Sequence, residues 1–269
     1  MDEAEKPGQP SKAAEAARGS APPAGSGDGG VRGTVKLDLG GTVLTAEVVV
    51  PKGPTTVRMI LPVLRGFSEA VVKVAVDKCE GAGKRKVSCK AGCGACCRQL
   101  VPISEPEAHE LAAVVAAMPE PRRGVVLGRF AAAREKLRAA GLLEDVAQLP
   151  PAGSDKKTEL GLAYFGQGIA CPFLEEESCS IYPDRPLVCR EYLVTNDPKH
   201  CAQPNAEVMD LVPIPGGLST PLMKASGGRV ALVLALEWAA THAEPAPKEA
   251  GPEVLMGVLR LASRTEKKD

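Results

Sequence analysis

Apolar and polar residues alternate from Val31 to Val50, which is the period of a β-strand with one buried face. The alternation is interrupted once, at Leu39-Gly40-Gly41, where two glycines favour a tight turn. Pro51-Lys52-Gly53-Pro54 then ends the second stretch. We therefore predict an antiparallel β-hairpin over residues 31–50.

Beyond residue 54 the apolar positions recur at threes and fours, which is the period of an amphipathic helix. Proline suits the first turn of a helix, so we place the first start at Pro62, with Gly81 and Gly83 as its end. Ser104 and Glu107 have the spacing of a capping box. We predict helices over residues 62–78, 104–118, 121–140, 156–165 and 230–242 and a last one from Pro252, with a loop over 142–153 and a proline- and glycine-rich stretch from 202 to 228.

These patterns predict a mainly α-helical protein with a small N-terminal β-hairpin. Residues 171–192 are rich in turn-forming residues, so we expect irregular backbone there, held together by a bound metal. We predict four parts along the chain: a disordered tail over 1–30, a hairpin and helix over 31–83, a cysteine-rich metal-binding domain over 84–202, and a helical extension over 203–269.

The composition narrows the classes of function. Lysine plus arginine and aspartate plus glutamate both number 33 in 269 residues, so no global charge attracts nucleic acid or an anionic membrane. No signal peptide and no membrane-spanning run is recognisable, because the most apolar stretch, 230–240, is short and contains Glu237. We expect a cytoplasmic protein with no nucleic-acid and no membrane partner. No Ser-His-Asp order or HExxH pattern supports a hydrolase.

Cysteines carry the strongest chemical signal. Of the nine cysteines, four fall between Cys89 and Cys97, and four more follow from residue 171. In a reducing compartment such clusters bind metal more often than they form disulfides. Cys79 lies outside the cluster spacing and is expected to be a plain thiol. The predicted metal ligands are Cys89, Cys93, Cys96, Cys97, Cys171, Cys179, Cys189 and Cys201.

The surroundings of the first four cysteines fit thiolate chemistry. Glycines at 92 and 94 let the backbone curl round an ion, and positive charge stabilises thiolates. The nearby basic residues are Lys84, Arg85, Lys86, Lys90 and Arg98. The side chains of Cys96 and Cys97 should diverge by about 100° on a helix. This divergence favours two metal centres, or one polynuclear centre with spare thiols.

Three alternatives stay open at this point. The basic run could bind nucleic acid, although it lacks interleaved aromatic residues. The cysteines could pair as disulfides, although their number is odd. The metal could be zinc, or iron alone or in an iron–sulfur cluster, since both zinc and such clusters take four cysteines. His200, beside Cys201, could substitute as a ligand.

The cysteine motifs resemble a known family. The chain reads Cys89 to Arg98, Cys171-Pro172-Phe173-Leu174, Cys179-Ser180-Ile181-Tyr182, Arg185-Pro186 and Cys189-Arg190. Together these segments are similar to the YkgJ-type CxxCxxCC cysteine-cluster family of zinc- or iron-chelating domains, over about Ser88 to Cys201. The first gap, Cys89 to Cys93, has three residues where the family name implies two, so Cys89 matches the pattern least.

The resemblance implies metal chelation with eight cysteines and no settled reaction. We rank first a zinc- or iron-chelating protein whose metal is structural and whose surface binds a protein partner. The alternative is an iron–sulfur oxidoreductase or a protein-modifying enzyme of the methylase kind, for which no catalytic residue is assigned. Arg185 and Arg190 are expected to lock loops by bonding to carbonyls, carboxylates or thiolates, and Tyr182 and Tyr192 to pack in a small core.

Overall fold

The computed structural model describes residues 30–38, 43–81, 83, 85–90, 92–202 and 209–264. The predicted tail over 1–30 lies outside these ranges except for Gly30. With 52% helix and an N-terminal antiparallel hairpin, the predicted mainly α-helical fold class is confirmed. No described helix is both long enough and apolar enough to cross a membrane.

The N-terminal hairpin is confirmed. Its strands are β1 (Gly30–Asp38) and β2 (Val43–Pro51), which pair antiparallel with Leu37 opposite Leu44. The predicted glycine turn falls outside the described residues. Leu37, Leu44 and Val50 are buried, because alternate residues of the hairpin face the rest of the molecule.

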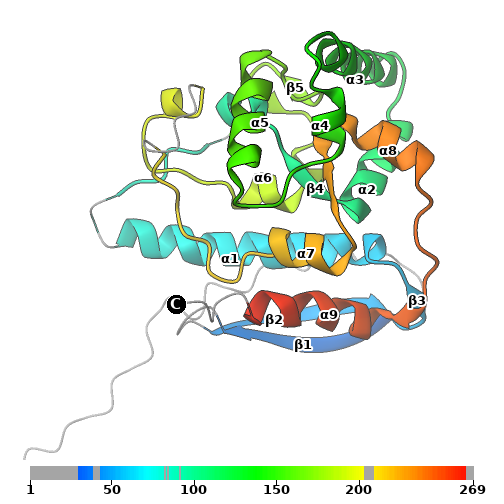
Figure 1. Cartoon of the computed structure of the whole chain (residues 1–269). Helices are drawn as coiled ribbons and strands as arrows, with labels where there is room; N and C mark the ends of the chain where they lie inside the picture. The colour runs from blue at the N-terminus through cyan, green and yellow to red at the C-terminus, as the bar shows by residue number, and fades with distance from the viewer. Residues whose placement is uncertain are drawn as a thin grey trace, which may run out of the picture.

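Three helices complete a first hydrophobic core above this hairpin (Figure 1). Helix α1 (Leu61–Gly81) begins within one residue of the predicted start, after the 3₁₀ turn η2 (Arg58–Ile60). Helix α9 (Gly251–Arg264) lies directly on the hairpin. Helix α7 (Ser219–Ala225) lies within the proline- and glycine-rich stretch, where no helix was predicted; Leu218 and Leu222 are fully buried here and provide the apolar contacts.

A second group of helices forms two further cores in the upper part of Figure 1. Helix α2 (Glu105–Ala116) begins with the predicted capping box, in which the Ser104 hydroxyl and the Glu107 carboxylate each accept a backbone N–H. Helices α3 (Arg122–Ala139) and α5 (Asp155–Gly166) agree with the sequence pattern. The expected loop over 142–153 contains a short helix, α4 (Leu143–Ala147), because buried Val146 anchors it.

Two of the small two-stranded sheets in the described structure join segments that are distant in the chain. Strand β4 (Pro102–Ser104) pairs with β7 (Arg229–Ala231), and β3 (Pro54–Thr55) pairs with β8 (Glu249–Ala250). The single helix predicted over 230–242 is therefore wrong. Residues 230–234 are all buried, which leaves no polar face, and they form β7 and a 3₁₀ turn, η6 (Leu232–Leu234), before the short helix α8 (Ala235–Thr241).

The cysteine-rich segments have little regular structure, as predicted, with one exception. Their elements are η3 (Ala95–Arg98), β5 (Leu174–Glu175), β6 (Ser178–Cys179), η4 (Tyr182–Asp184), α6 (Leu187–Glu191) and η5 (Pro198–His200). The five-residue helix α6 corrects the expectation of irregular backbone throughout. Pro186 precedes it, and the buried Glu107 carboxylate accepts the Leu187 N–H at 2.7 Å, which supplies a partner for its first turn.

Candidate metal centre

The first cysteine segment curls back on itself. The Cys93 N–H donates to the carbonyl of Lys90 at 3.2 Å, and Gly92 has φ +80°, a conformation that L side chains rarely adopt. Cys96 and Cys97 follow in the 3₁₀ turn η3. The glycine at position 92 therefore serves the role predicted for it.

The second cysteine segment is bonded directly to the first. The Cys171 N–H donates to the carbonyl of Cys97 at 2.7 Å, and a turn then closes between Leu174 N–H and the Cys171 carbonyl at 2.9 Å. Cys179 lies on β6, opposite Leu174 on β5. Residues about 80 positions apart in the chain are thus held side by side by backbone hydrogen bonds.

Backbone N–H groups point at three of the sulfur atoms. The Val194 N–H lies 3.4 Å from Cys89 Sγ. The N–H of Phe173 donates to the Cys171 thiol and that of Ile181 to the Cys179 thiol, each two residues after its cysteine. Such bonds favour the thiolate form and are a usual feature of cysteine metal sites.

Eight of the nine cysteines gather in one region, and their thiols lie close enough to affect one another. Burial, and next the negative charges of neighbouring cysteines, raise the pKa of Cys201 to about 11. Burial raises the pKa of Cys171 to about 12, with a further contribution from Cys179 and Cys96. Burial also raises the pKa of Cys189 well above its usual value. Cys79, at the C-terminal end of α1, stands apart.

The mutual effects divide these thiols into two sets. Within each set the negative charge of one thiolate raises the pKa of its neighbours. The charge of Cys96 raises the pKa of members of both sets. The first set is Cys89, Cys93 and Cys201, and the second is Cys97, Cys171, Cys179 and Cys189. All nine cysteines are free thiols, so the disulfide alternative is not supported.

The two sets meet at the adjacent pair Cys96 and Cys97. The Cys97 thiol donates a hydrogen bond to Cys96, which is the main reason that the pKa of Cys96 falls to about 7 while the pKa of Cys97 rises. The two adjacent thiols therefore lie within hydrogen-bonding distance of each other. Among the described residues, no three cysteine, histidine or carboxylate groups are already arranged as a metal site, so binding requires the thiols to turn toward a common centre.

Arg185 is a positive group that acts on several of the thiols, and thiolates were among the partners predicted for it. Its guanidinium lies 4.1 Å from the centre of the Tyr182 ring, and its Nε is buried with no hydrogen-bond partner in the described structure. Its charge opposes the effect of burial on the pKa of Cys89 and of Cys179. Arg185 thus offsets the charge of thiolates. Tyr182 is 50% exposed, so its expected place in a small core is wrong.

The basic run around the first cysteines has other partners in the fold. Arg98 donates to both carboxylate oxygens of Glu177 and to the Gly94 carbonyl, and Arg85 pairs with Asp210. Lys84 lies outside the described residues. Acids from distant segments thus pair with two of the basic residues that surround the first cysteines.

The two cysteine segments approach each other closely at Gly94. A Cβ at this position would lie 2.6 Å from Leu174 Cδ1 and 3.1 Å from the backbone Cα of Glu177. We expect Gly94→Ala to separate the segments, to destabilise the protein by about 1–3 kcal/mol and to weaken metal binding. Urea unfolding and metal titration measure both effects.

Gly128→Ala is the matched control for this substitution. Gly128 lies in α3, and no atom lies within 4 Å of the position that an added Cβ would take, so alanine there should raise stability by up to about 1 kcal/mol. If both alanine variants bind metal like the original protein, the close approach at Gly94 is not needed for the site.

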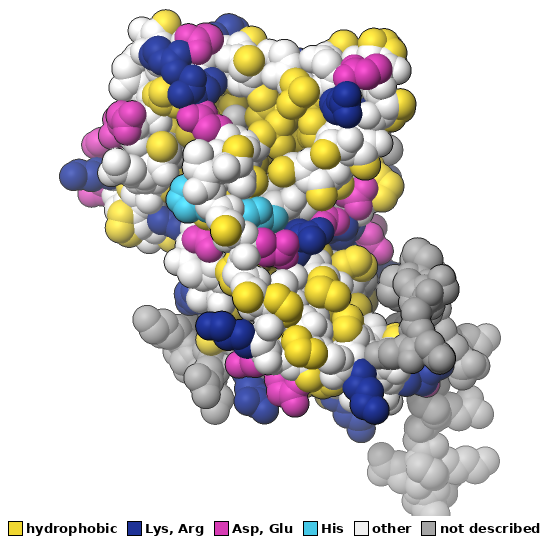
Figure 2. Space-filling view, turned by 90° about the vertical axis from the view of Figure 1, so that its right-hand side faces the viewer, with side chains coloured by type: hydrophobic (Ala, Val, Ile, Leu, Met, Phe, Trp, Pro, Cys, Tyr) yellow, Lys and Arg dark blue, Asp and Glu magenta, His cyan; other side chains and the backbone are white. Residues whose placement is uncertain are grey.

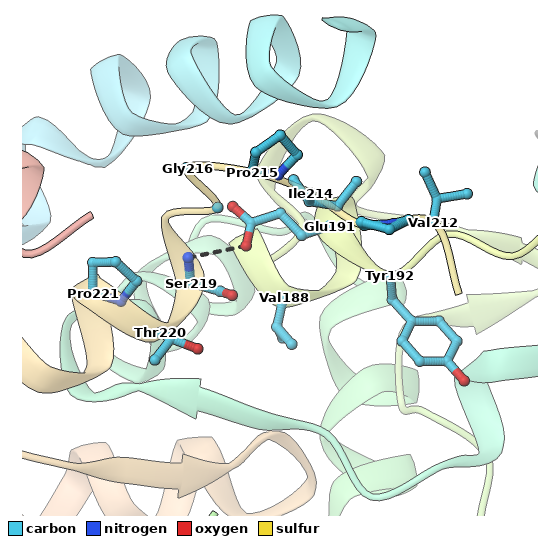
Figure 3. A pocket seen from close by; sticks show the side chains of 12 residues that line it. Val188, Glu191, Tyr192, Val212, Ile214, Pro215, Gly216, Ser219, Thr220 and Pro221 are labelled. Carbon is cyan, nitrogen blue, oxygen red and sulfur yellow. Dashed lines mark hydrogen bonds between the residues drawn. The ribbon is translucent and has the colours of Figure 1, made fainter. Parts of the chain in front are cut away.

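One cavity of about 620 Å³ lies against the cysteine region, between α6 and α7 (Figure 3). Val188, Glu191 and Tyr192 line its α6 side. The Glu191 carboxylate is already occupied, because it accepts the N–H groups of Leu218 and Ser219 and the Ser68 hydroxyl. Cys189 is not among the lining residues, so this cavity is next to the cysteine cluster without opening onto its sulfur atoms.

Residues 88–206 match the family model CxxCxxCC, described as “Putative zinc- or iron-chelating domain”. Residues 88–206, called the CxxCxxCC domain below, are similar to this family over less than half of the chain. The match contains every cysteine of the cluster, including the departing Cys89, and agrees with the resemblance stated from the motifs. No curated protein and no solved structure matches the chain.

The donor set of the CxxCxxCC domain fits a soft or borderline metal ion. Eight free thiols, N–H groups directed at sulfur and a nearby guanidinium are suited to zinc or iron, and no cluster of carboxylate oxygens suggests magnesium or calcium in the described residues. The family description therefore supports metal chelation in general terms. The identity of the ligands and of the metal is the subject of the proposal below.

Proposed function

We propose that the CxxCxxCC domain chelates zinc or iron through two groups of four thiolates and that the metal holds its loops together. One group is Cys89, Cys93, Cys96 and Cys201. The other is Cys97, Cys171, Cys179 and Cys189. A tetrahedral zinc ion or an iron–sulfur cluster takes four cysteines, so eight thiols suit two such centres.

The observation that carries this proposal is the gathering of eight free cysteines from segments far apart in the chain. Thiols with raised pKa values are protonated at neutral pH when no metal is bound. A bound cation would favour their thiolate forms, because its positive charge offsets the free-energy cost of burying several negative charges. Each metal would then cross-link loops that have few backbone hydrogen bonds of their own.

A structural role for the metal is supported by the cavities. Neither the cavity between α6 and α7 nor a second one beside α2 is lined by a cysteine. An enzyme that works at a metal keeps an open coordination position facing its substrate. The surroundings of the cysteines therefore favour a closed, chelated centre over the iron–sulfur enzyme, which remains the second outcome of the test.

The test is metal analysis of protein purified without air, with assays for zinc, iron and acid-labile sulfide. We expect about two zinc ions or two iron centres per chain, since each four-thiolate group holds one. Cys93→Ser and Cys171→Ser should each lose about half of the metal, because they lie in different groups. Cys79→Ser is the matched control and should lose none.

Each alternative outcome has its own meaning. Loss of all metal in both single variants would indicate one polynuclear centre. Stoichiometric iron and sulfide with reversible reduction would favour the redox enzyme. A protein that binds neither zinc nor iron, with thiols that react freely in all variants, would contradict the proposal.

A further inference from the structure

A second cavity, of about 400 Å³, lies outside the cysteine cluster. We call it the α2–α9 cavity because its walls come from the start of α2, from α9, from residues 55–58 and from residues 244–249. Figure 2 shows histidine, acidic and basic side chains gathered across the middle of the face on which these elements meet. Its volume is within the range of small-molecule sites.

The α2–α9 cavity contains an unusual number of unpartnered polar atoms. Six buried side-chain nitrogen or oxygen atoms lack a hydrogen-bond partner in the described structure, and three of the six belong to residues that line this cavity. They are Thr56 Oγ1, His109 Nε2 and Glu244 Oε1. Because buried polar groups are normally paired, three such atoms at one cavity suggest a ligand that completes them.

Their neighbours show which sign of charge the ligand should carry. Arg58 is already bonded, with Nε 2.9 Å from Glu244 Oε2 and Nη1 3.4 Å from Glu110 Oε2. The carboxylates of Glu105 and Glu249 also line the cavity, and Lys248 is its other cation. Acidic groups therefore outnumber basic ones, and the second carboxylate oxygen of Glu244, Oε1, has no hydrogen-bond partner among the described residues.

Glu105 adds to this acidic side. Its carboxylate has no hydrogen bond or ion pair among the described residues, and it lies against the paired glycines at 227 and 228. A Cβ at Gly228 would lie 2.9 Å from Glu105 Oε1, so glycine leaves room for the carboxylate. The remaining wall includes the apolar side chains of Val254 and Val258. The cavity combines acceptor atoms with a hydrocarbon surface.

We propose that the α2–α9 cavity binds a primary alkylammonium group. Such a group has three N–H donors and no acceptor, which matches in number the three unpartnered atoms, each of which can accept. Its hydrocarbon stem would lie along the valine wall. His109, on α2, offers its Nε2 atom as one of these acceptors, and its ring lies 5.3 Å from that of Trp238.

The ammonium group could belong to a free amine or to a lysine side chain of a peptide. Calorimetric titration of the full-length, metal-loaded protein with n-butylamine, n-butanol and butyrate tests the shared chemistry. We expect saturable binding of butylamine and at least about tenfold weaker binding of the other two, because they lack the charge or reverse it. Nα-acetyl-lysine N-methylamide then distinguishes the sources: tighter binding than butylamine indicates a peptide lysine, and weaker binding a free amine.

Two variants test whether butylamine binds in the α2–α9 cavity. Thr56→Val is nearly isosteric and removes one acceptor, and Glu244→Gln removes the charge; each should weaken butylamine binding by about tenfold. Glu47→Gln, on the exposed hairpin, is the control and should bind as before. Metal content should be unchanged in all three, which separates this proposal from that for the cysteines. Equal binding of the three probes, preference for butyrate, or binding unaffected in Thr56→Val would overturn it.

Discussion

Removal of the metal from the intact protein is expected to lower its melting temperature by roughly 10–20 °C, since each kcal/mol lost shifts the midpoint by about 2–4 °C in a protein of this size. A strong chelator in anaerobic, reducing buffer would remove it. Circular dichroism would follow melting, and metal analysis of the same sample would confirm removal. Added zinc or iron should restore the original midpoint.

The size of this effect follows from how the cysteine loops are held. Of the residues described between Ser88 and Val101, only those of the four-residue turn η3 form a regular element, and the described part of the loop that carries Cys201 has only the three-residue turn η5. Structural zinc contributes about 10–16 kcal/mol to the folding of small zinc domains, and we expect a smaller loss here, about 5 kcal/mol, because three apolar cores remain when the metal is removed. The hairpin and α9 have their own core, so we expect the loss of structure on metal removal to be greatest in the CxxCxxCC domain.

A single ligand substitution should reproduce part of the effect. Cys189 lies on α6, is half-buried and belongs to one of the two proposed groups, so Cys189→Ser should release one metal and lower the midpoint by about half as much as the chelator does. Cys79→Ser changes the same atoms outside the cluster and should melt like the original protein. An unchanged midpoint after complete removal of metal would show that the metal does not stabilise the fold.

Local periodicity accounts for the elements that the sequence predicted well. The hairpin alternates because one face is buried, and α2 begins at Ser104 because Glu107 completes a capping box. The predictions from sequence failed where burial against distant parts of the chain determines the secondary structure. Residues 230–234 carry no periodic face because β4 and neighbouring helices surround them, and α7 is stabilised by Leu218 and Leu222 against α1 and α9. Such contacts are not visible in a local pattern.

The cysteines themselves could be found from sequence because thiols are rare and their spacing is distinctive. Their division into two sets could not, because it depends on which loops meet: Cys171 bonds to the backbone of Cys97, and Val194 supplies the N–H to Cys89. The sequence did predict thiolates among the partners of Arg185. Arginines near the first cysteines in sequence are paired with acids, whereas Arg185 reaches the thiols from a distant segment. The predicted domain boundaries stay predictions.

Arg190 is expected to be the most sensitive residue of the cluster region that is not itself a ligand. It is 2% exposed, and its guanidinium donates to the carbonyls of Arg185, Tyr182 and Pro183 and to Glu69. The prediction that this arginine locks a loop is confirmed by these bonds. Because burial lowers its pKa against the attraction of Glu69, the side chain depends on this set of partners.

Arg190→Gln should therefore lower the free energy of unfolding by about 3–5 kcal/mol, measured by urea titration with metal present, because three carbonyls lose their shared donor. Arg190→Lys keeps the charge but lacks the planar fork, so it should recover only part of the loss. Arg32→Gln removes an arginine whose side chain is 77% exposed and should cost less than about 0.5 kcal/mol. Equal effects at positions 190 and 32 would mean that the loop before Cys189 is fixed by the metal alone, because the carbonyl contacts would then contribute nothing measurable.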